Sequence, residues 1–313
     1  MPPQPVAANN EAAPGGHGSG VLTGVVLALV TITIWVGWFI STRFLVTTGL
    51  AAEDVAALRF GVSGLLLLPF ALRDRVAIAR MGLPRFAILS VGAGAPYVLT
   101  IAAGLSFAPA AHAAALTPGV MPLFVALLSA FLLKERISAS RTGGFILILA
   151  GVLGIAAAGL QAGPADEWKG HLLFLSGAFM WACYTLALRG SGLGALPAAA
   201  VVSVTSLVLY IPIYAMTGGA RLLNAPADDV IFAAFYQGVL TGALSLVTYA
   251  AALERLGPSR AAAFASLIPV LTLLAAIPLL GEVPHGLDLI GIAAVSAGVY
   301  LATGLNGAWP RRR

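Results

Sequence analysis

Long apolar runs alternate with short polar connections along almost the whole chain. A membrane-spanning helix needs about 20 mostly apolar residues to cross a hydrocarbon layer of about 30 Å. Runs that meet this requirement, or nearly so, lie at 21–45, 55–72, 86–107, 110–133, 143–160, 172–188, 195–216, 230–253, 261–280 and 287–305. We therefore predict an all-α integral membrane protein of ten transmembrane helices, with connections too short to hold a soluble domain.

The composition indicates that lipid is the main solvent. Hydrophobic residues make up 59% of the 313 positions and charged residues only 9%, whereas soluble domains carry about 25% charged residues. Residues 1–20 are rich in Pro, Gly and Ala without periodicity, which predicts a disordered cytoplasmic tail. They lack a basic start before an apolar stretch, so we do not expect a cleaved signal peptide. Residues 306–313 are predicted to form a basic cytoplasmic tail.

The second half of the chain repeats marker residues of the first half at a nearly constant offset. The pairs are Trp35 with Trp181, Arg43 with Arg189, Pro122 with Pro269, and Glu135 with Glu282. Five spans per copy is an odd number, so the second copy must enter the membrane from the other face. The sequence therefore predicts an inverted repeat of five plus five helices, with the first copy at 21–162 and the second at 168–305.

Positive charge agrees with this inversion, because Lys and Arg in short loops are retained on the cytoplasmic side. With both termini inside, the inner loops and tail hold most of the 17 cations: Arg73, Arg75, Arg80, Arg85, Lys134, Arg136, Arg141, Arg189, Arg255, Arg260, Arg311, Arg312 and Arg313. We expect a multi-pass protein of the cell inner (plasma) membrane with both termini cytoplasmic. Basic residues spread over loops do not predict a nucleic-acid partner.

Several kinds of chemistry are excluded by missing motifs. The chain has no Walker-type phosphate loop, no His-Glu-x-x-His and no Gly-x-Ser-x-Gly. A single cysteine, Cys183, rules out an intramolecular disulfide and a multi-cysteine zinc site. The four histidines are scattered along the sequence. We therefore expect no enzyme, no catalytic residues, no metal and no cofactor. No Asp or Glu is predicted at the membrane midplane, which favours neutral, zwitterionic or amphipathic cargo and leaves the driving force open.

Prolines mark expected interruptions of the helices, because proline removes a backbone donor. The predicted breaks lie at Pro96, Pro118, Pro122 and Pro269, with further prolines inside spans at Pro212 and Pro278. Broken helices near the midplane are typical of secondary transporters, whose substrate site lies between the repeats. Kinks that only suit helix packing are the alternative.

Four stretches together resemble a known family: "IWVGWFISTRF", "ALRFGVSGLLLLP", "PAAHAAALTPGVMPLFVALLSAFLLKERIS" and "GPSRAAAFASLIPVLTLLAAIPLLGE". Their order and spacing are similar to those of the ten-helix EamA branch of the drug/metabolite transporter superfamily, over nearly everything from Val21 to Leu305. The resemblance implies an inner-membrane carrier, and family members typically export amino acids, related metabolites or drugs. It implies no particular substrate.

Candidate substrate-cavity residues are aromatic or carry a hydroxyl or imidazole group. They are Trp35, Trp38, Tyr97, Thr100, His112, Trp181, Tyr184, Ser245 and Tyr249. Interfacial aromatic belts and hydroxyls that bridge helices are the structural alternatives. For Arg59 we expect a side chain close enough to the outer face to snorkel, with an anchoring or helix-pairing role rather than a carboxylate ligand. For His112, a role in substrate or proton binding stays open beside a structural one.

Two cross-repeat ion pairs are candidate gates. In the inverted topology, Arg43 and Glu282 share the outer face, while Arg189 and Glu135 share the inner face. Such pairs would form alternating gates, although each Glu capping a helix and each Arg snorkelling is the alternative. The small residues Gly151, Gly154, Gly159, Gly291 and Gly298 predict close packing of the fifth and tenth spans, either internally or at a dimer face, so monomer and homodimer both stay open.

The sequence therefore predicts a secondary transporter that exports amino acids or related small metabolites by alternating access, with membrane lipid and a small-molecule substrate as its partners. A multidrug exporter of amphipathic compounds is the first alternative. A membrane scaffold or lipid-binding protein without transport activity is the second.

Overall fold

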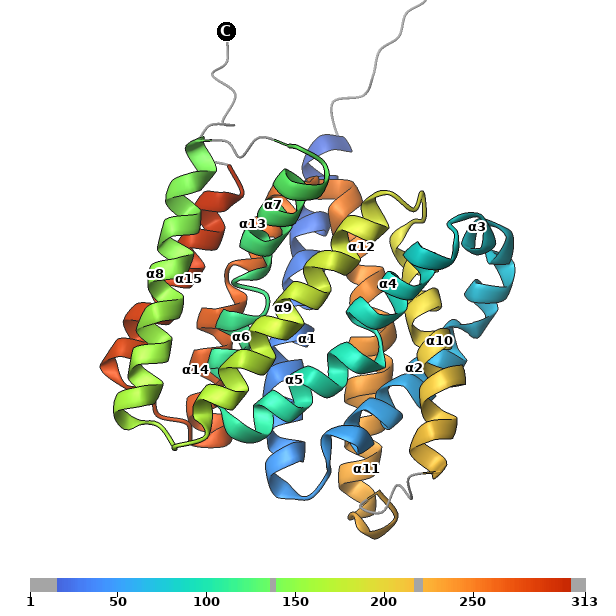
Figure 1. The fold of residues 1–313 in the computed structure, drawn as a ribbon. Coiled ribbons are helices and arrows are strands. Elements are labelled where there is room, and N and C mark those ends of the chain that lie inside the picture. The colour runs from blue at the N-terminus through green and yellow to red at the C-terminus, as the bar shows by residue number, and fades with distance from the viewer. Residues whose placement is uncertain (1–15, 136–138, 217–221, 305–313) are drawn as a thin grey trace, which may run out of the picture.

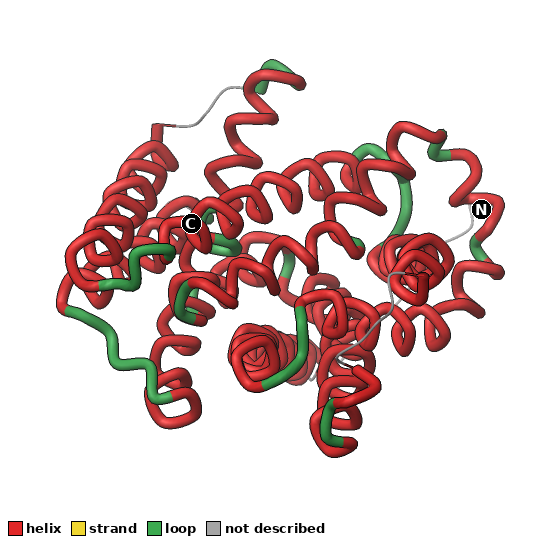
Figure 2. The backbone as a smooth tube through the Cα atoms, turned by 60° about the horizontal axis from the view of Figure 1, so that its bottom comes forward, coloured by secondary structure: helices red, strands yellow, loops and turns green. Residues whose placement is uncertain are grey.

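The computed structural model describes residues 16–135, 139–216 and 222–304, and this part of the chain consists of helices and short connections without strands (Figures 1 and 2). The helices are α1 (Gly16–Thr48), α2 (Ala52–Arg73), α3 (Arg75–Arg80), α4 (Leu83–Ala93), α5 (Ala95–Phe107), α6 (Ala110–Leu116), α7 (Met121–Leu132), α8 (Ala139–Ala162), α9 (Glu167–Arg189), α10 (Ala195–Met216), η1 (Leu222–Asn224), α11 (Ala227–Ala233), the π-helix η2 (Ala234–Leu244), α12 (Ser245–Leu256), α13 (Pro258–Ala265), α14 (Ile268–Leu280) and α15 (Gly286–Ala302).

Nine helical stretches of the described residues are long and apolar enough to cross a membrane, and α15 is a shorter apolar helix. They coincide with the predicted spans, so the all-α membrane fold is confirmed. Residues 1–15 and 305–313, which include most of the predicted tails, lie outside the described residues. The prediction is wrong for 16–20, which form the start of α1. A helix already nucleated by the apolar run adds residues at little further cost.

Three interruptions lie at or next to the four prolines that were predicted to mark breaks. Gly94 separates α4 from α5, a turn separates α6 from α7, and Ser266 and Leu267 separate α13 from α14. Pro96, Pro122 and Pro269 lie in the first turn of the helix that follows, where a missing N–H costs nothing, and Pro118 lies in the α6–α7 turn.

Not every proline interrupts its helix. The expectation is wrong for Pro212 and Pro278, which lie inside the continuous helices α10 and α14. Neighbouring helices can re-satisfy the backbone groups that proline frees. The span of α11, η2 and α12 is irregular without any proline, through the π-helix η2.

The described chain begins and ends on the same side of the molecule. We call this side, at the top of Figure 1, the terminal face, and the other side the opposite face. The spans reverse direction at each connection, so α1 and α9, the first helices of the two predicted copies, run in opposite directions (Figure 1).

Helix contacts are consistent with a twofold relation between the halves. The largest interfaces join α8 with α15 and α2 with α10. The packing of α1 on α12 is matched by that of α9 on α5, and the packing of α1 on α14 by that of α9 on α7. The exact five-plus-five inverted repeat stays a prediction, and this pattern of contacts supports it.

Glycines bring α8 and α15 into backbone contact. A Cβ atom added to Gly151 would lie 2.6 Å from the carbonyl oxygen of Gly291, and one added to Gly298 would lie 2.7 Å from that of Gly144. These glycines therefore serve packing within one chain, the first of the two roles that the sequence left open.

The repeated Leu-Leu-x-Glu motif ends α7 and α14 in the same way. The x position is left-handed in both copies, at Lys134 (φ 55°) and Gly281 (φ 68°). The amide of the following glutamate then donates to a carbonyl six residues earlier, from Glu135 to Ser129 and from Glu282 to Ala276, each at 3.3 Å. The left-handed residue turns the chain at the helix end as it does in the Schellman motif, although the closing bond here spans six residues rather than five.

Candidate functional site

A buried cluster of polar side chains lies towards the opposite face, where α6, α9 and α15 begin. His112 comes from the first turn of α6, Glu167 and His171 from the first two turns of α9, and Asp288 from the first turn of α15. Glu167 and His171 are four residues apart, so they lie on one face of their helix. All four residues are at most 8% exposed.

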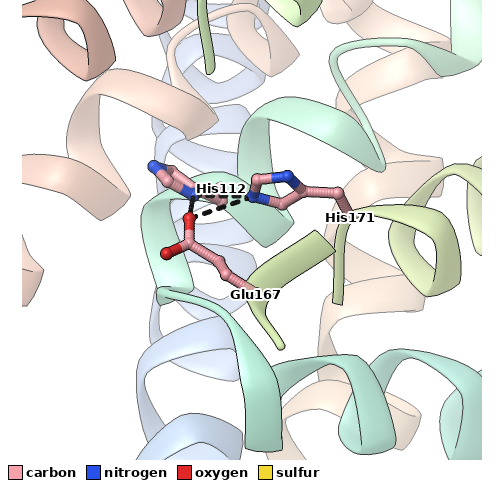
Figure 3. Close-up of side chains that lie close together, drawn as sticks. All are labelled: His112, Glu167 and His171. Atoms are coloured by element: carbon pink, nitrogen blue, oxygen red, sulfur yellow. Dashed lines mark hydrogen bonds and ion pairs between the residues drawn. The ribbon is translucent and has the colours of Figure 1, made fainter. Parts of the chain in front are cut away.

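Three of these side chains point toward one another (Figure 3). The Nδ1 atom of His112 lies 3.0 Å from Nε2 of His171 and 3.0 Å from Oε1 of Glu167. The Nε2 atom of His171 lies 3.2 Å from the same Glu167 oxygen. Two imidazole nitrogens and one carboxylate oxygen therefore meet around a single point.

Asp288 holds the other side of the His112 ring. Its Oδ1 lies 3.1 Å from Nε2 of His112, and its Oδ2 accepts a hydrogen bond of 2.9 Å from the backbone N–H of His285. A carboxylate only accepts hydrogen bonds, so Nε2 carries a proton. In the neutral ring, Nδ1 is then left with a free lone pair that faces Glu167 and His171.

The sequence analysis did not foresee this cluster. It treated the four histidines as scattered, which is wrong for His112 and His171, because the fold brings them together with Glu167 and Asp288. The Glu167-to-His171 spacing was the one available signal. Three helices must fold together before the remaining contacts exist, so no local pattern could reveal them.

Next to the cluster, Arg43 and Glu282 form an ion pair. Arg43 Nε lies 2.8 Å from Glu282 Oε1, with side chains 20% and 16% exposed. Arg43 also donates to the carbonyl of Leu105, and Glu282 Oε2 accepts from the N–H of Ala110 at 2.9 Å. The pair thus fastens α1 and the end of α14 to the connection between α5 and α6.

A cavity of about 160 Å³ connects the ion pair and the cluster. Its lining includes Arg43, His112, Glu167, Glu282 and Asp288. Polar groups of both halves of the chain therefore share one small pocket near the opposite face.

The second predicted pair lies near the terminal face and is looser. Arg189 Nη1 lies 3.5 Å from Glu135 Oε1, and both side chains are 53% exposed. Both ion pairs are formed in this conformation, so the structure does not show them alternating. Their role as gates stays a proposal.

Four of the predicted cavity residues form a row of rings across the two halves. Trp38 and Tyr97 have ring centroids 6.0 Å apart, Tyr97 and Trp181 4.9 Å, and Trp181 and Tyr184 5.3 Å. We call Trp38, Tyr97, Trp181 and Tyr184 the aromatic row.

The other predicted cavity residues lie apart from this row. Trp35 packs on Tyr249 at 5.1 Å, and His112 belongs to the polar cluster. Thr100 donates to the carbonyl of Pro96, and Ser245 to that of Thr241, each at 2.8 Å. Both hydroxyls thus bond to their own span in this conformation.

Arg59 differs from its prediction. It lies about two turns into α2 rather than near the helix end, and its guanidinium carbon is 5.1 Å from the Trp38 ring centroid and 5.9 Å from that of Phe60. Its Nε and Nη1 atoms are buried and have no hydrogen-bond partner among the described residues, and neither does Nε1 of Trp38. Snorkelling is therefore wrong for Nε and Nη1, whereas the contact between Arg59 of α2 and Trp38 of α1 agrees with the helix-pairing role.

The fold and these features define a multi-span helical membrane protein of the transporter class. The model of the EamA-like transporter family matches the chain twice, at residues 22–157 and 168–304. The chain belongs to the EamA-like transporter family, and the resemblance stated from the sequence is confirmed. A small-molecule substrate and a membrane setting follow from this membership, which also fits the prediction that the chain is not an enzyme.

Two named relatives are exporters. The chain is 29% identical over 224 residues to the "Probable amino-acid metabolite efflux pump" of Salmonella typhimurium, covering 66% of this chain and 74% of that protein. It is 28% identical over 284 residues to the "Probable terminal-alkyne amino-acid exporter" of Streptantibioticus cattleyicolor, covering 90% and 93%. A solved crystal structure aligns with a TM-score of 0.61 at 21% identity, over 93% of this chain and 99% of that chain, and shows the fold alone.

Proposed function

We propose that this transporter exports amino acids with apolar or aromatic side chains by alternating access. The observation that carries the proposal is that Nε and Nη1 of Arg59 are buried without a hydrogen-bond partner among the described residues, beside the aromatic row. The names of both relatives describe probable exporters of amino acids or their metabolites, which supports the same substrate class. We propose further that the terminal face is cytoplasmic. Described cations near that face support this orientation: Arg73, Arg75, Arg80, Arg85, Lys134, Arg141, Arg189, Arg255 and Arg260.

Arg59 is suited to bind a carboxylate. Arg59 is partly exposed, and burying its Nε and Nη1 atoms without partners is unfavourable. Contact with the Trp38 ring offsets about 1–2 kcal/mol of that cost. The unused N–H groups of Arg59 and the nearby Nε1–H of Trp38 would donate to the two oxygens of a substrate carboxylate. The aromatic row would pack against the substrate's side chain.

Alternating access would use the seam between the halves, where the row lies. The Arg43–Glu282 pair would close the opposite face and the Arg189–Glu135 pair the terminal face. With both pairs formed, the conformation described here would be closed to both sides. Each pair joins residues of different halves, so rocking of one half against the other would break one pair at a time.

The test measures uptake of labelled phenylalanine and of phenethylamine, which lacks the carboxylate, into vesicles containing the purified protein. Arg59→Gln should remove charge-assisted hydrogen bonds to the substrate carboxylate, which are worth about 1.5–3 kcal/mol. We therefore expect this variant to lower phenylalanine transport at least about tenfold and to leave phenethylamine transport unchanged. Arg73→Gln removes an exposed arginine from the same helix and is the matched control, with unchanged transport.

A second variant tests the aromatic row. Trp181→Ala, or Trp35→Ala for the neighbouring pair, removes a ring while leaving Arg59 in place. We expect Trp181→Ala to weaken transport of phenylalanine more than that of alanine, because only the larger substrate packs on the row. Equal phenylalanine transport by wild type and Arg59→Gln contradicts the proposal, and uptake of chemically dissimilar dyes without amino-acid uptake indicates a multidrug exporter instead.

A further inference from the structure

We propose that His112, Glu167 and His171 bind a divalent transition-metal ion such as Zn²⁺ near the opposite face, with Asp288 orienting His112. The donor atoms are Nδ1 of His112, Nε2 of His171 and Oε1 of Glu167, which all lie within 4.8 Å of one another. This proposal revises the expectation of no metal that the sequence produced. It does not depend on which substrate the transporter carries.

The triangle of donor atoms has the size that a metal ion requires. Zinc binds imidazole nitrogen and carboxylate oxygen at about 2.0–2.2 Å, and two such ligands at angles of 90–109° lie about 3.0–3.5 Å apart. The separations in the cluster are 3.0, 3.0 and 3.2 Å. A single ion could therefore contact all three donors with only small shifts of their side chains.

Hydrogen bonds among the three groups do not account for this packing as well. A proton on one atom of the triangle can point along only one of its edges and the carboxylate oxygen carries none, so hydrogen bonds bridge at most two of the three close contacts. Glu167 Oε1 shows the result: it lies 3.0 Å and 3.2 Å from the two ring nitrogens, yet it has no hydrogen bond of acceptable geometry among the described residues. A cation at the centre would satisfy all three donors.

Asp288 occupies the position of a second ligand shell. Histidines that bind metals usually donate their other ring N–H to a carboxylate, which fixes the tautomer and makes the ligand more basic. His112 does so toward Oδ1 of Asp288, while Oδ2 of Asp288 is held by the backbone of His285. The lone pair of Nδ1 is thereby aimed at the proposed ion.

Neighbouring elements leave room for the ligands. A Cβ atom on Gly159 would lie 2.9 Å from Oε1 of Glu167 and 3.0 Å from a ring carbon of His171, so the α8 glycine lets the cluster form. The cavity of about 160 Å³ borders His112 and Glu167. Three protein ligands beside a cavity leave a fourth position for water or another small ligand.

A bound ion would join the two halves of the transporter. His112 belongs to the first half, while Glu167 and His171 begin the first helix of the second half. The ion would add a bond across the seam beside the Arg43–Glu282 pair. We therefore infer that metal binding favours the conformation closed at the opposite face and slows transport.

The test uses the purified full chain in detergent after removal of metals with a chelator. Zinc titration against a chromophoric competitor should give one site per chain. Cobalt should give visible d–d absorption of a site with nitrogen and oxygen ligands. His171→Gln should weaken zinc binding at least about a hundredfold, and Asp288→Asn about 10–100-fold, the range for second-shell changes.

Asp166→Asn is the matched control, because this carboxylate directly precedes Glu167 at the start of α9, but its side chain is 59% exposed, pairs with Lys169 and contributes no donor to the triangle. It should leave zinc affinity unchanged. Gly159→Ala should weaken binding without removing any ligand, which covers the case that His171→Gln does not fold. Absence of stoichiometric zinc or cobalt binding to the wild-type chain, or equal weakening by Asp166→Asn and Gly159→Ala, overturns the proposal.

Discussion

The two ion pairs should differ in strength, and this difference predicts which face opens more readily. Arg43 and Glu282 are 2.8 Å apart and about one-fifth exposed or less, while Arg189 and Glu135 are 3.5 Å apart and more than half exposed. Water screens the second pair far more than the first. Exposed pairs contribute about 0–1 kcal/mol, whereas close, partly buried pairs have coupling energies of about 1.5 kcal/mol or more.

We expect a coupling energy of about 2 kcal/mol for Arg43–Glu282 and below about 0.5 kcal/mol for Arg189–Glu135. The difference of about 1.5 kcal/mol corresponds to roughly a tenfold ratio of populations. If each pair closes its own face, the face with the weaker pair opens first, so the resting protein should be accessible mainly from the terminal face.

Double-mutant cycles measure both couplings. Each cycle compares the free energy of unfolding in detergent micelles for wild type, the two single Gln variants and the double variant. Losses that belong to one residue alone, such as the bond from Arg43 to Leu105 or from Ala110 to Glu282, cancel in the cycle when both single variants keep the fold. Equal couplings, or a larger value for Arg189–Glu135, would refute the assignment of the stronger closure to the opposite face.

Two further predictions concern packing and helix ends, and both are checked by the same unfolding measurement. Gly144→Ala should destabilise the protein by about 1–3 kcal/mol, because the added Cβ would lie 2.6 Å from the Gly298 carbonyl oxygen. A Cβ at the adjacent Gly143 meets no atom within 4 Å, so Gly143→Ala should be neutral or slightly stabilising. Similar effects at the two positions would contradict the close approach of α8 and α15. Lys134→Gly should stabilise the folded protein and Gly281→Ala should destabilise it, each by about 1 kcal/mol, because both positions have left-handed backbone conformations. Destabilisation by Lys134→Gly would count against the shared helix ending.

Much of the fold could be predicted from the sequence, because span length and apolar content are local properties. The membrane thickness fixes how many apolar residues a span needs, so runs such as 195–216 coincide with a helix, α10. The marker pair Glu135 and Glu282 likewise identified equivalent positions in the two copies, although no local pattern explained the form of the Leu-Leu-x-Glu motif. The structure supplies an explanation, a left-handed residue that lets the glutamate amide close the helix.

The sites were less predictable, because they depend on long-range contacts. Arg59 was placed near the surface by counting from Val55, but α2 begins at Ala52, and the additional residues carry the guanidinium inward to Trp38. His112 was named as a candidate without its partners. Those partners lie at the starts of two other helices, where acidic and polar residues are common for reasons of capping alone.

Equivalent spans are interrupted in different ways, and this limits how symmetric a transport cycle could be. In the third span, Gly94 adopts extended backbone, and the freed N–H of Ala95 is bound by Ser206 Oγ of α10 at 3.1 Å. Pro96 has no N–H, so no rearrangement can restore an unbroken α-helical ladder there. In the eighth span, by contrast, the π-helix η2 keeps its backbone bonds at a wider spacing. The eighth span could revert to an α-helix while the third could not, so under alternating access the two end states would not be mirror images of each other.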